Sequence, residues 1–252
     1  MKNPLKSLFS RGAADYSCAA VICAAGSSQR MGEDKLKLRL DGVPVLARTL
    51  KVFDDCPEIR EIIVVVREEE LIETAQLCND FDIHKATKIL IGGSNRTESA
   101  LFGVSEVGTR HNLIAIHDGA RPMVTGDIIT EAIDAAYKNL AAAPGIRLKD
   151  TVKSLSEGLA DCTLAREAIV AVQTPQVFEA DLIKAALTAA YRRGDEITDD
   201  CAAVEALGIE ITITDGSEEN IKITTPVDLL LAEAILKKRK EALELQEGLE
   251  GE

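Results

Sequence analysis

The sequence has little of what marks a metal or redox protein. It contains no tryptophan, and only 3% of its residues are aromatic. Its six cysteines, at positions 18, 23, 56, 78, 162 and 201, form no CxxC pair, and its three histidines form no HExxH pattern. These absences argue against a zinc site and against a redox pair. Reduced, buried thiols are the simpler interpretation, because unpaired cysteine behaves as a small apolar residue.

Long apolar runs and an excess of basic residues are also missing. No run approaches the ~20 residues that a membrane span needs, and the longest candidates are residues 18–26 and 62–66. The chain carries 29 Lys and Arg against 42 Asp and Glu, a formal net charge of −13. Nucleic-acid affinity depends on clustered cations that neutralise phosphates, so this balance argues against a nucleic-acid partner. We therefore expect a cytoplasmic protein with neither a nucleic-acid nor a membrane partner.

The length and composition predict one large α/β domain over residues 18–240. A chain of 252 residues that is 46% hydrophobic can bury a sizeable core. Residues 1–17 carry Lys2, Lys6 and Arg11 with few acids, which faintly resembles a targeting peptide, but they lack a continuous apolar core. We expect a flexible extension there. The acidic segment 241–252 offers little to bury and is expected to fray.

Short apolar runs alternate with segments of helical periodicity through the first half of the chain. The runs at 19–24, 61–66, 88–91 and 113–117 are nearly continuous in apolar residues, as buried parallel strands are. Helical spacing is seen over residues 45–53, 68–79, 95–107 and 126–140. Repeated βαβ units predict a three-layer, Rossmann-like, mostly parallel sheet, in which ligands bind at the carboxyl ends of the strands.

The alternation of apolar runs with helical segments is interrupted near residue 147. Strand-like runs at 151–155 and 168–172 surround a polar turn at 156–161, which predicts a protruding β-arm over about 147–172. Helices are then predicted at 180–192 and 199–207, strands at 210–214 and 220–223, and a last helix from Pro226, because proline suits the first helical turn.

The strongest chemical signal is the string AAGSSQRMG at residues 24–32, which follows a predicted buried strand. Small residues there let backbone N–H groups approach an anion closely. The string is not a GxxxxGK[ST] P-loop, and Gly26 and Gly32 do not form GxGxxG. Arg30 and Lys35 would bring two cations to a nucleotide triphosphate under attack at phosphorus. A glycine-rich turn with solvated charges is the alternative.

This string resembles the AAGxxxRM…K signature of sugar-nucleotide pyrophosphorylases and cytidylyltransferases. Further blocks follow in family order: GG at 92–93 with Arg96 and Ser99, IHDGARP at 116–122, DTVK at 150–153, TPQ at 174–176, TD at 198–199 and NIKIT at 220–224. Together they resemble the 2-C-methyl-D-erythritol 4-phosphate cytidylyltransferase family over about residues 19–239. The gap between Arg30 and Lys35 is shorter than in many members, which leaves Lys37 as an alternative to Lys35.

The resemblance implies an enzyme that moves CMP from CTP onto 2-C-methyl-D-erythritol 4-phosphate with release of pyrophosphate, in non-mevalonate isoprenoid precursor synthesis. Two other readings stay open: a cytidylyltransferase for another polyol phosphate, such as ribitol 5-phosphate, and a non-catalytic nucleotide-binding regulator.

The resemblance also assigns residues to roles. The implied catalytic residues are Arg30, Lys35, Arg166 and Lys222. The implied CTP-binding residues are Ala24, Ala25, Gly26, Ser27, Ser28, Arg30, Met31, Lys35, Gly92, Gly93, Ser99, Asp118, Gly119 and Lys222. The implied acceptor-binding residues are Arg121, Thr151, Arg166, Thr174 and Thr198.

Asp118 follows the strand 113–117, at the end where a carboxylate could hold Mg²⁺, or another divalent cation, against phosphate oxygens. An Asp-Gly turn is the plainer alternative. Arg121 could reach a phosphate or pair with Asp118. On a strand, Lys222 would point opposite to its apolar neighbours, although an edge lysine would look the same.

For the arm, the resemblance implies a homodimer. Each arm would reach into the partner subunit, where Arg166 and Thr151 would grip the polyol phosphate. Without the resemblance, Arg166 would be read as a solvated surface residue.

Overall fold

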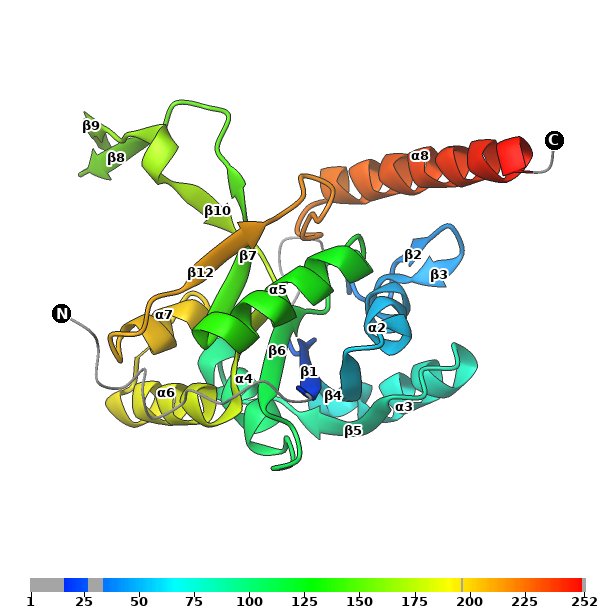
Figure 1. Ribbon diagram of the computed structural model, residues 1–252, viewed down its shortest axis with the longest axis horizontal. Helices are drawn as coiled ribbons and strands as arrows, with labels where there is room; N and C mark the ends of the chain where they lie inside the picture. The colour runs from blue at the N-terminus through cyan, green and yellow to red at the C-terminus, as the bar shows by residue number, and fades with distance from the viewer. Residues whose placement is uncertain (1–15, 27–33, 196, 251–252) are drawn as a thin grey trace.

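The nearly continuous apolar runs form the centre of one large sheet (Figure 1). This computed structural model describes residues 16–26, 34–195 and 197–250. Within them the sheet has the strand order β10-β7-β11-β6-β1-β4-β5, and β12 also pairs with β7. Its strands are β1 (Cys18–Cys23), β4 (Ile59–Val66), β5 (Ala86–Ile91), β6 (Leu113–Asp118), β7 (Ala141–Arg147), β10 (Val170–Val172), β11 (Gln176–Glu179) and β12 (Thr212–Asp215).

The central strands are parallel, as the sequence predicts. β1 pairs in parallel with both β4 and β6, and β4 pairs in parallel with β5. At the other side of this sheet, β10 and β11 run antiparallel to the strands they pair with. The register places Cys23, at the end of β1, opposite Asp118, at the end of β6. The carboxyl ends of two central strands therefore meet at one edge of the sheet, where open α/β sheets bind ligands.

Helices cover both faces of the sheet and make three layers. Alternate residues of β1 face opposite sides, with Ala20 and Ile22 in one core and Ala19 and Val21 in the other. The first core is closed by α2 (Val45–Asp55), α5 (Gly126–Asn139) and the start of α8 (Pro226–Glu250), with α3 (Leu71–Asp80) at its rim. The second is closed by α4 (Arg96–Ser105), α6 (Ala180–Arg193) and α7 (Asp200–Glu205). Burial on both faces explains why these strands read as apolar runs.

The predicted arm is present as a hairpin of β8 (Lys153–Ser156) and β9 (Leu159–Thr163), which projects away from the sheet in Figure 1. Its turn lies at Glu157 and Gly158, both with positive φ. The side chains of Leu155 and Leu159 are 72% and 75% exposed. A short 3-10 turn, η2 (Arg166–Ala168), then leads into β10, which joins the main sheet instead of the arm.

The prediction of a strand at 220–223 is wrong: these residues form a loop, because they find no strand partner. The last helix begins at Pro226 as predicted, and α8 continues as far as Glu250. Strands β7 and β11 were missed, and the structure places β11 between β7 and β6.

The smaller elements are β2 (Arg39–Leu40), β3 (Val43–Pro44) and the 3-10 turn η1 (Glu68–Glu70). In the described part of the chain, no helix has both the length and the apolar character of a bilayer span.

Candidate active site

A pocket of about 340 Å³ opens at the carboxyl ends of β1 and β6. Its walls come from five places in the chain: the end of β1, the turn after residue 33, the start of α4, the end of β6, and the loop before α8. The lining residues are Cys23, Ala24, Ala25, Gly26, Lys35, Leu36, Gly93, Ser94, Asn95, Arg96, Ser99, Asp118, Ala120 and Lys222. Segments more than a hundred residues apart in sequence thus meet where the parallel sheet leads one to expect a ligand.

The small residues of the predicted phosphate loop form one wall. The backbone N–H of Ala24 donates to the carbonyl of Val65 at 2.7 Å, which continues the pairing of β1 with β4 past the end of the strand. A Cβ added to Gly26 would meet none of the described residues within 4 Å. Ser27, Ser28, Arg30 and Met31 lie outside the described residues.

Lys35 and Lys37 take different directions. Lys35 lines the pocket. The Nζ of Lys37 lies 2.5 Å from Glu73 Oε2 on α3, and this exposed ion pair raises the pKa of Lys37. The structure therefore favours Lys35 over Lys37 as the lysine of the phosphate loop.

The glycines before α4 allow close packing beside the pocket. A Cβ on Gly92 would lie 2.6 Å from the Ala25 Cβ and 2.8 Å from Ser99 Oγ, so only glycine fits. The Gly93 N–H donates to Ser99 Oγ at 3.0 Å, and that hydroxyl donates to the Asn95 carbonyl at 2.9 Å. Gly93 and Ser99 line the pocket, and Gly92 does not. Because the single hydroxyl hydrogen of Ser99 is used inside the loop, Ser99 shapes this wall.

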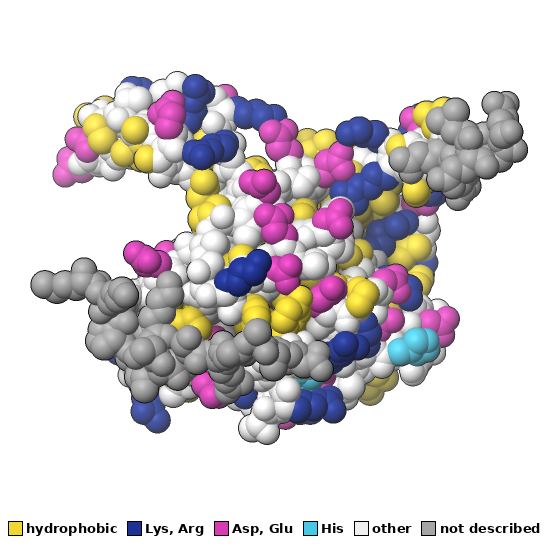
Figure 2. All heavy atoms as spheres, in the orientation of Figure 1, with side chains coloured by type: hydrophobic (Ala, Val, Ile, Leu, Met, Phe, Trp, Pro, Cys, Tyr) yellow, Lys and Arg dark blue, Asp and Glu magenta, His cyan; other side chains and the backbone are white. Residues whose placement is uncertain are grey.

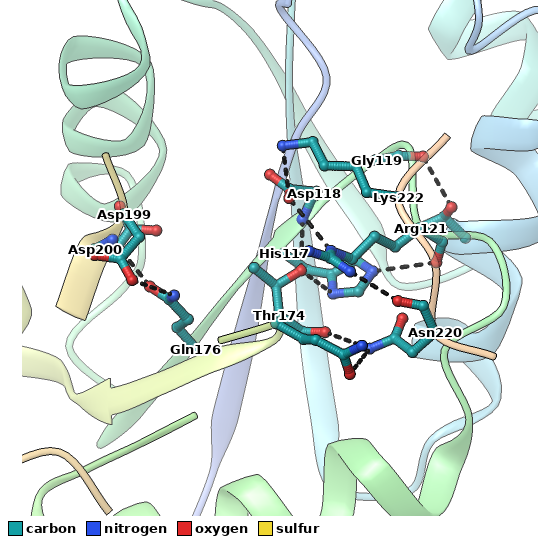
Figure 3. Close-up of polar contacts among 12 residues, drawn as sticks. His117, Asp118, Gly119, Arg121, Thr174, Gln176, Asp199, Asp200, Asn220 and Lys222 are labelled. Carbon is teal, nitrogen blue, oxygen red and sulfur yellow. Dashed lines mark hydrogen bonds and ion pairs between the residues drawn. The ribbon is translucent and has the colours of Figure 1, made fainter. Parts of the chain in front are cut away.

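Asp118 and Lys222 form an ion pair at the wall of the pocket. Lys222 Nζ lies 2.9 Å from Asp118 Oδ2, and Arg121 Nε lies 3.4 Å from the same oxygen (Figure 3). Burial alone would raise the pKa of Asp118, but the positive charges of Lys222, Arg96 and Arg121 outweigh it and hold this pKa below its ordinary value. Asp118 is therefore an anion throughout the physiological pH range.

A buried hydrogen-bond network supports the pair of Asp118 and Lys222 (Figure 3). Burial lowers the pKa of His117 to about 3, so its ring is neutral, and its Nε2 contacts the Arg121 carbonyl at 3.4 Å. That leaves His117 Nδ1 to accept from the Thr174 hydroxyl at 2.9 Å, while Thr174 Oγ1 accepts from the Asp118 N–H at 3.2 Å. Asn220 Nδ2 donates to the Thr174 carbonyl at 3.0 Å, and Arg121 donates to the Asn220 carbonyl at 2.7 Å. The loop that carries Lys222 is thereby joined to the end of β6.

This network changes the interpretation of three predicted site residues. Thr174 is 4% exposed and lies beneath Asp118 with its hydroxyl occupied, so it does not line the pocket. Arg121 pairs with Asp118, which was the alternative reading of that residue. Gly119 donates from its N–H to the Cys23 carbonyl at 2.9 Å and accepts from the Thr49 hydroxyl. His117 belongs to the same network and does not line the pocket.

Arg96 lies in one of the motifs of the family resemblance, but the sequence indicates no role for it. The structure places it on the pocket wall, where its guanidinium forms two hydrogen bonds with Asp200, at 2.9 and 2.6 Å. Asp200 is fully buried, and the Gln176 side chain accepts from its backbone N–H and donates to Asp199 Oδ2 (Figure 3). The start of α4 is thus fixed to the start of α7. A basic residue and an acidic residue 104 positions apart give no local signal of this pairing.

The predicted acceptor residues of the arm stay away from the pocket of their own chain. Arg166 donates to the Lys149 carbonyl at 2.7 Å within the arm, and its side chain is 50% exposed. Thr151 and Thr198 are also exposed. None of these three residues lines the pocket.

Comparison with known proteins places the chain in a family. The sequence model of 2-C-methyl-D-erythritol 4-phosphate cytidylyltransferase matches residues 18–238. The chain belongs to this family. Proteins of that name from Dehalococcoides mccartyi and Caldanaerobacter subterraneus are 46% and 44% identical to it; each match covers 87% of this chain, and 96% and 99% of the relative, respectively.

Solved structures support the same assignment. The 4-diphosphocytidyl-2C-methyl-D-erythritol synthase of Anaerococcus prevotii superposes with a TM-score of 0.79 at 29% identity, over 88% of this chain and 99% of that one. The 2-C-methyl-D-erythritol 4-phosphate cytidylyltransferase of Thermus thermophilus gives a TM-score of 0.72 at 30% identity, over 86% and 98%. The predicted family and the predicted Rossmann-like fold are both confirmed.

Proposed function

We propose that this chain transfers CMP from CTP to 2-C-methyl-D-erythritol 4-phosphate and releases pyrophosphate. The observation that carries the proposal is the pocket at the ends of β1 and β6, bounded by Lys35, Asp118 and Lys222, in a member of the cytidylyltransferase family. A phosphate oxygen of the acceptor attacks the α-phosphorus of CTP. The new P–O bond forms as the bond from that phosphorus to the bridging oxygen of the β-phosphate breaks.

The reaction needs no general base from the protein. The second pKa of a phosphate monoester is about 6, so the acceptor is already a nucleophilic dianion at neutral pH. This fits a pocket whose nearest histidine, His117, is neutral, buried and fully hydrogen-bonded. What the protein must supply is charge stabilisation and alignment of two mutually repelling anions.

Cationic side chains would supply that stabilisation. Lys35 and Lys222 both line the pocket, and Lys222 pairs there with Asp118. We assign Lys35, with Arg30, to the charge that develops on the α-phosphoryl group and the leaving pyrophosphate. Lys222 positions the acceptor phosphate. Gly93 and the neighbouring residues that start α4 border the space for the cytosine ring.

Asp118 is suited to hold Mg²⁺ together with CTP. Its carboxylate is ionised and lies at the pocket wall, and the described residues contain no group of three or more His, Cys, Asp or Glu side chains that could hold a metal alone. Mg²⁺ commonly takes one or two carboxylates and completes its shell with substrate phosphates. When bound, the ion neutralises charge on the triphosphate. We expect a chelator to abolish turnover, and Asp118→Asn to raise the Mg²⁺ concentration needed for half-maximal rate.

The acceptor half of the site requires a second copy of the chain in this proposal. No arm residue lines the pocket of its own chain, yet the arm carries the exposed apolar side chains of Leu155 and Leu159. Contiguous exposed apolar groups are typical of interaction surfaces. We propose a homodimer in which the partner's Arg166 and the partner's Thr151 hold the acceptor phosphate.

Pyrophosphate release tests the function directly. Purified protein is given Mg²⁺ and CTP with 2-C-methyl-D-erythritol 4-phosphate or with ribitol 5-phosphate, and the nucleotide product is identified by ³¹P NMR. We expect rapid release and a diphosphate-linked CMP product with the methylerythritol acceptor. A higher kcat/KM with ribitol 5-phosphate would overturn the acceptor assignment. CTP binding without turnover on either acceptor would overturn the enzymatic proposal.

A further inference from the structure

A short turn beside the pocket is built on Asp34. Its carbonyl accepts from the Lys37 N–H at 3.0 Å, and its Oδ1 accepts from the Leu36 N–H at 3.2 Å. Leu36 is 6% exposed and packs into the core, and its carbonyl accepts from the Leu46 N–H at 3.1 Å. Lys35 lies inside this turn and lines the pocket. The position of Lys35 therefore depends on how firmly Asp34 is held.

Arg67 holds Asp34 from the end of β4. Arg67 Nη2 lies 2.5 Å from Asp34 Oδ2, and the same nitrogen contacts Glu70 in the turn that follows. The three side chains are 26%, 16% and 6% exposed, respectively. None of them borders the nucleotide pocket, and the proposed chemistry does not use them.

The contact is more than a surface ion pair. Asp34 and Glu70 both contact the same nitrogen of Arg67, and burial, and then the neighbouring Asp34 carboxyl, raise the pKa of Glu70. Removing Arg67 would leave two partly buried carboxyl groups without their cation, and they would repel each other unless one took up a proton. The turn would then lose its anchor on β4. The neighbouring ion pair of Lys37 with Glu73 differs. Its side chains are 47% and 59% exposed, so it stabilises the turn little.

We infer that Arg67 is a positioning residue for Lys35: by clamping Asp34, it fixes the turn that presents the Lys35 ammonium group to the triphosphate. This inference rests on the role given to Lys35 in the proposed function. A displacement of about 1 Å in a catalytic group can cost about 10²-fold in rate. Arg67 therefore acts on kcat although it touches neither substrate.

The test is a double-mutant cycle on kcat, with KM for CTP measured in parallel. Arg67→Met removes the guanidinium but keeps an unbranched apolar stem, and it is expected to lower kcat about 10- to 100-fold. Because Arg67 acts through Lys35, adding Arg67→Met to Lys35→Ala should lower kcat no further than Lys35→Ala alone. Glu73→Gln, which breaks the neighbouring exposed pair, is the matched control and should keep kcat within about twofold.

If the Arg67→Met protein does not fold, Asp34→Asn is the variant for the same test. It keeps an oxygen for the Leu36 N–H but removes the charge facing Arg67, so the same fall in kcat and the same non-additivity with Lys35→Ala are expected. Arg67→Lys should restore part of the rate, because it returns one positive charge without the fork of donors.

Two results would overturn the inference. One is a folded Arg67→Met protein with normal kcat while Lys35→Ala is impaired. The other is a double mutant whose loss is the product of the two single losses, which would mean that Arg67 acts independently of Lys35. If instead Lys35→Ala itself turns over normally, the proposed function of Lys35 fails, and that outcome is distinct from both.

Discussion

The nucleotide pocket and the arm differ in how far their charged side chains are buried and paired. In the pocket, Arg96 makes two hydrogen bonds to a fully buried Asp200, and Lys222 lies 2.9 Å from a largely buried Asp118. In the arm, Arg166 is half exposed, and its nearest carboxylate is 3.8 Å away. Figure 2 shows the arm standing clear of the main body, with apolar and charged side chains together on its surface.

This difference indicates which half of the site one chain completes. A paired, buried charge keeps a single geometry, which electrostatic stabilisation of a transition state requires. An exposed arginine in the arm reaches a similarly fixed geometry only when another surface covers it. The pocket is therefore preorganised, and the exposed arm is consistent with the proposed homodimer, in which a second copy closes the acceptor site.

The largest expected effect is on the nucleotide side. Lys35→Ala should keep the fold and lower kcat by about 10²–10³, the usual cost of removing one preorganised electrostatic group. Lys37→Ala is the matched control, because its ammonium pairs with Glu73. Steady-state kinetics check both variants, and circular dichroism checks the fold. Near-normal turnover of Lys35→Ala would show that the loop lysine has no such role.

The next effect concerns stability. Arg96→Met leaves Asp200 buried without its partner and should lower the free energy of unfolding by about 3–5 kcal/mol. Glu167→Gln, which removes the carboxylate nearest Arg166, should change it by less than about 0.5 kcal/mol. Urea unfolding measures both. Equal changes in the free energy of unfolding would mean that buried ion pairing does not distinguish the pocket from the arm.

A smaller effect is a pH dependence that comes from beneath the pocket. Burial lowers the pKa of His117 from 6.5 to about 3, so between these values the unfolded chain binds more protons than the folded one. The contribution of His117 to stability is complete above pH 6.5. It falls below that pH by up to about 1.4 kcal/mol per pH unit.

Urea unfolding between pH 7.5 and 4.5 measures this loss. His117→Asn should show a shallower decline than the parent chain, whereas a substitution in the arm, such as Glu167→Gln, should leave the slope unchanged. The same slope for His117→Asn and the parent would contradict the assignment of a buried neutral imidazole.

Much of the fold, and much of the lining of the candidate pocket, could be predicted from the sequence. The apolar runs of β1, β4 and β6 predict buried parallel strands. The string AAGSSQRMG after β1 lies where such a sheet binds ligands. β7 was missed because its run AAAPG is rich in alanine and contains proline and glycine, which disfavour strands in general. β11 was missed because four residues directly after a proline give too short a pattern.

The remaining parts depend on contacts between distant segments. Nothing near Asp34 in the sequence indicates its pairing with Arg67, and nothing near Arg96 indicates Asp200. The alternation around Lys222 predicted a strand, yet the loop is shaped by Asn220 and its bonds to Thr174 and Arg121. Tertiary hydrogen bonds, and not local propensity, set the direction of that lysine.

Subunit complementation tests most directly whether one chain builds the nucleotide half and a second copy completes the acceptor half. Lys35→Ala and Arg166→Met proteins, each nearly inactive alone, are mixed under conditions that exchange subunits, and hybrids are counted by native mass spectrometry. A hybrid holds one intact site, so an equal mixture should recover about a quarter of the parent activity. Hybrids that form but recover no activity would contradict the account.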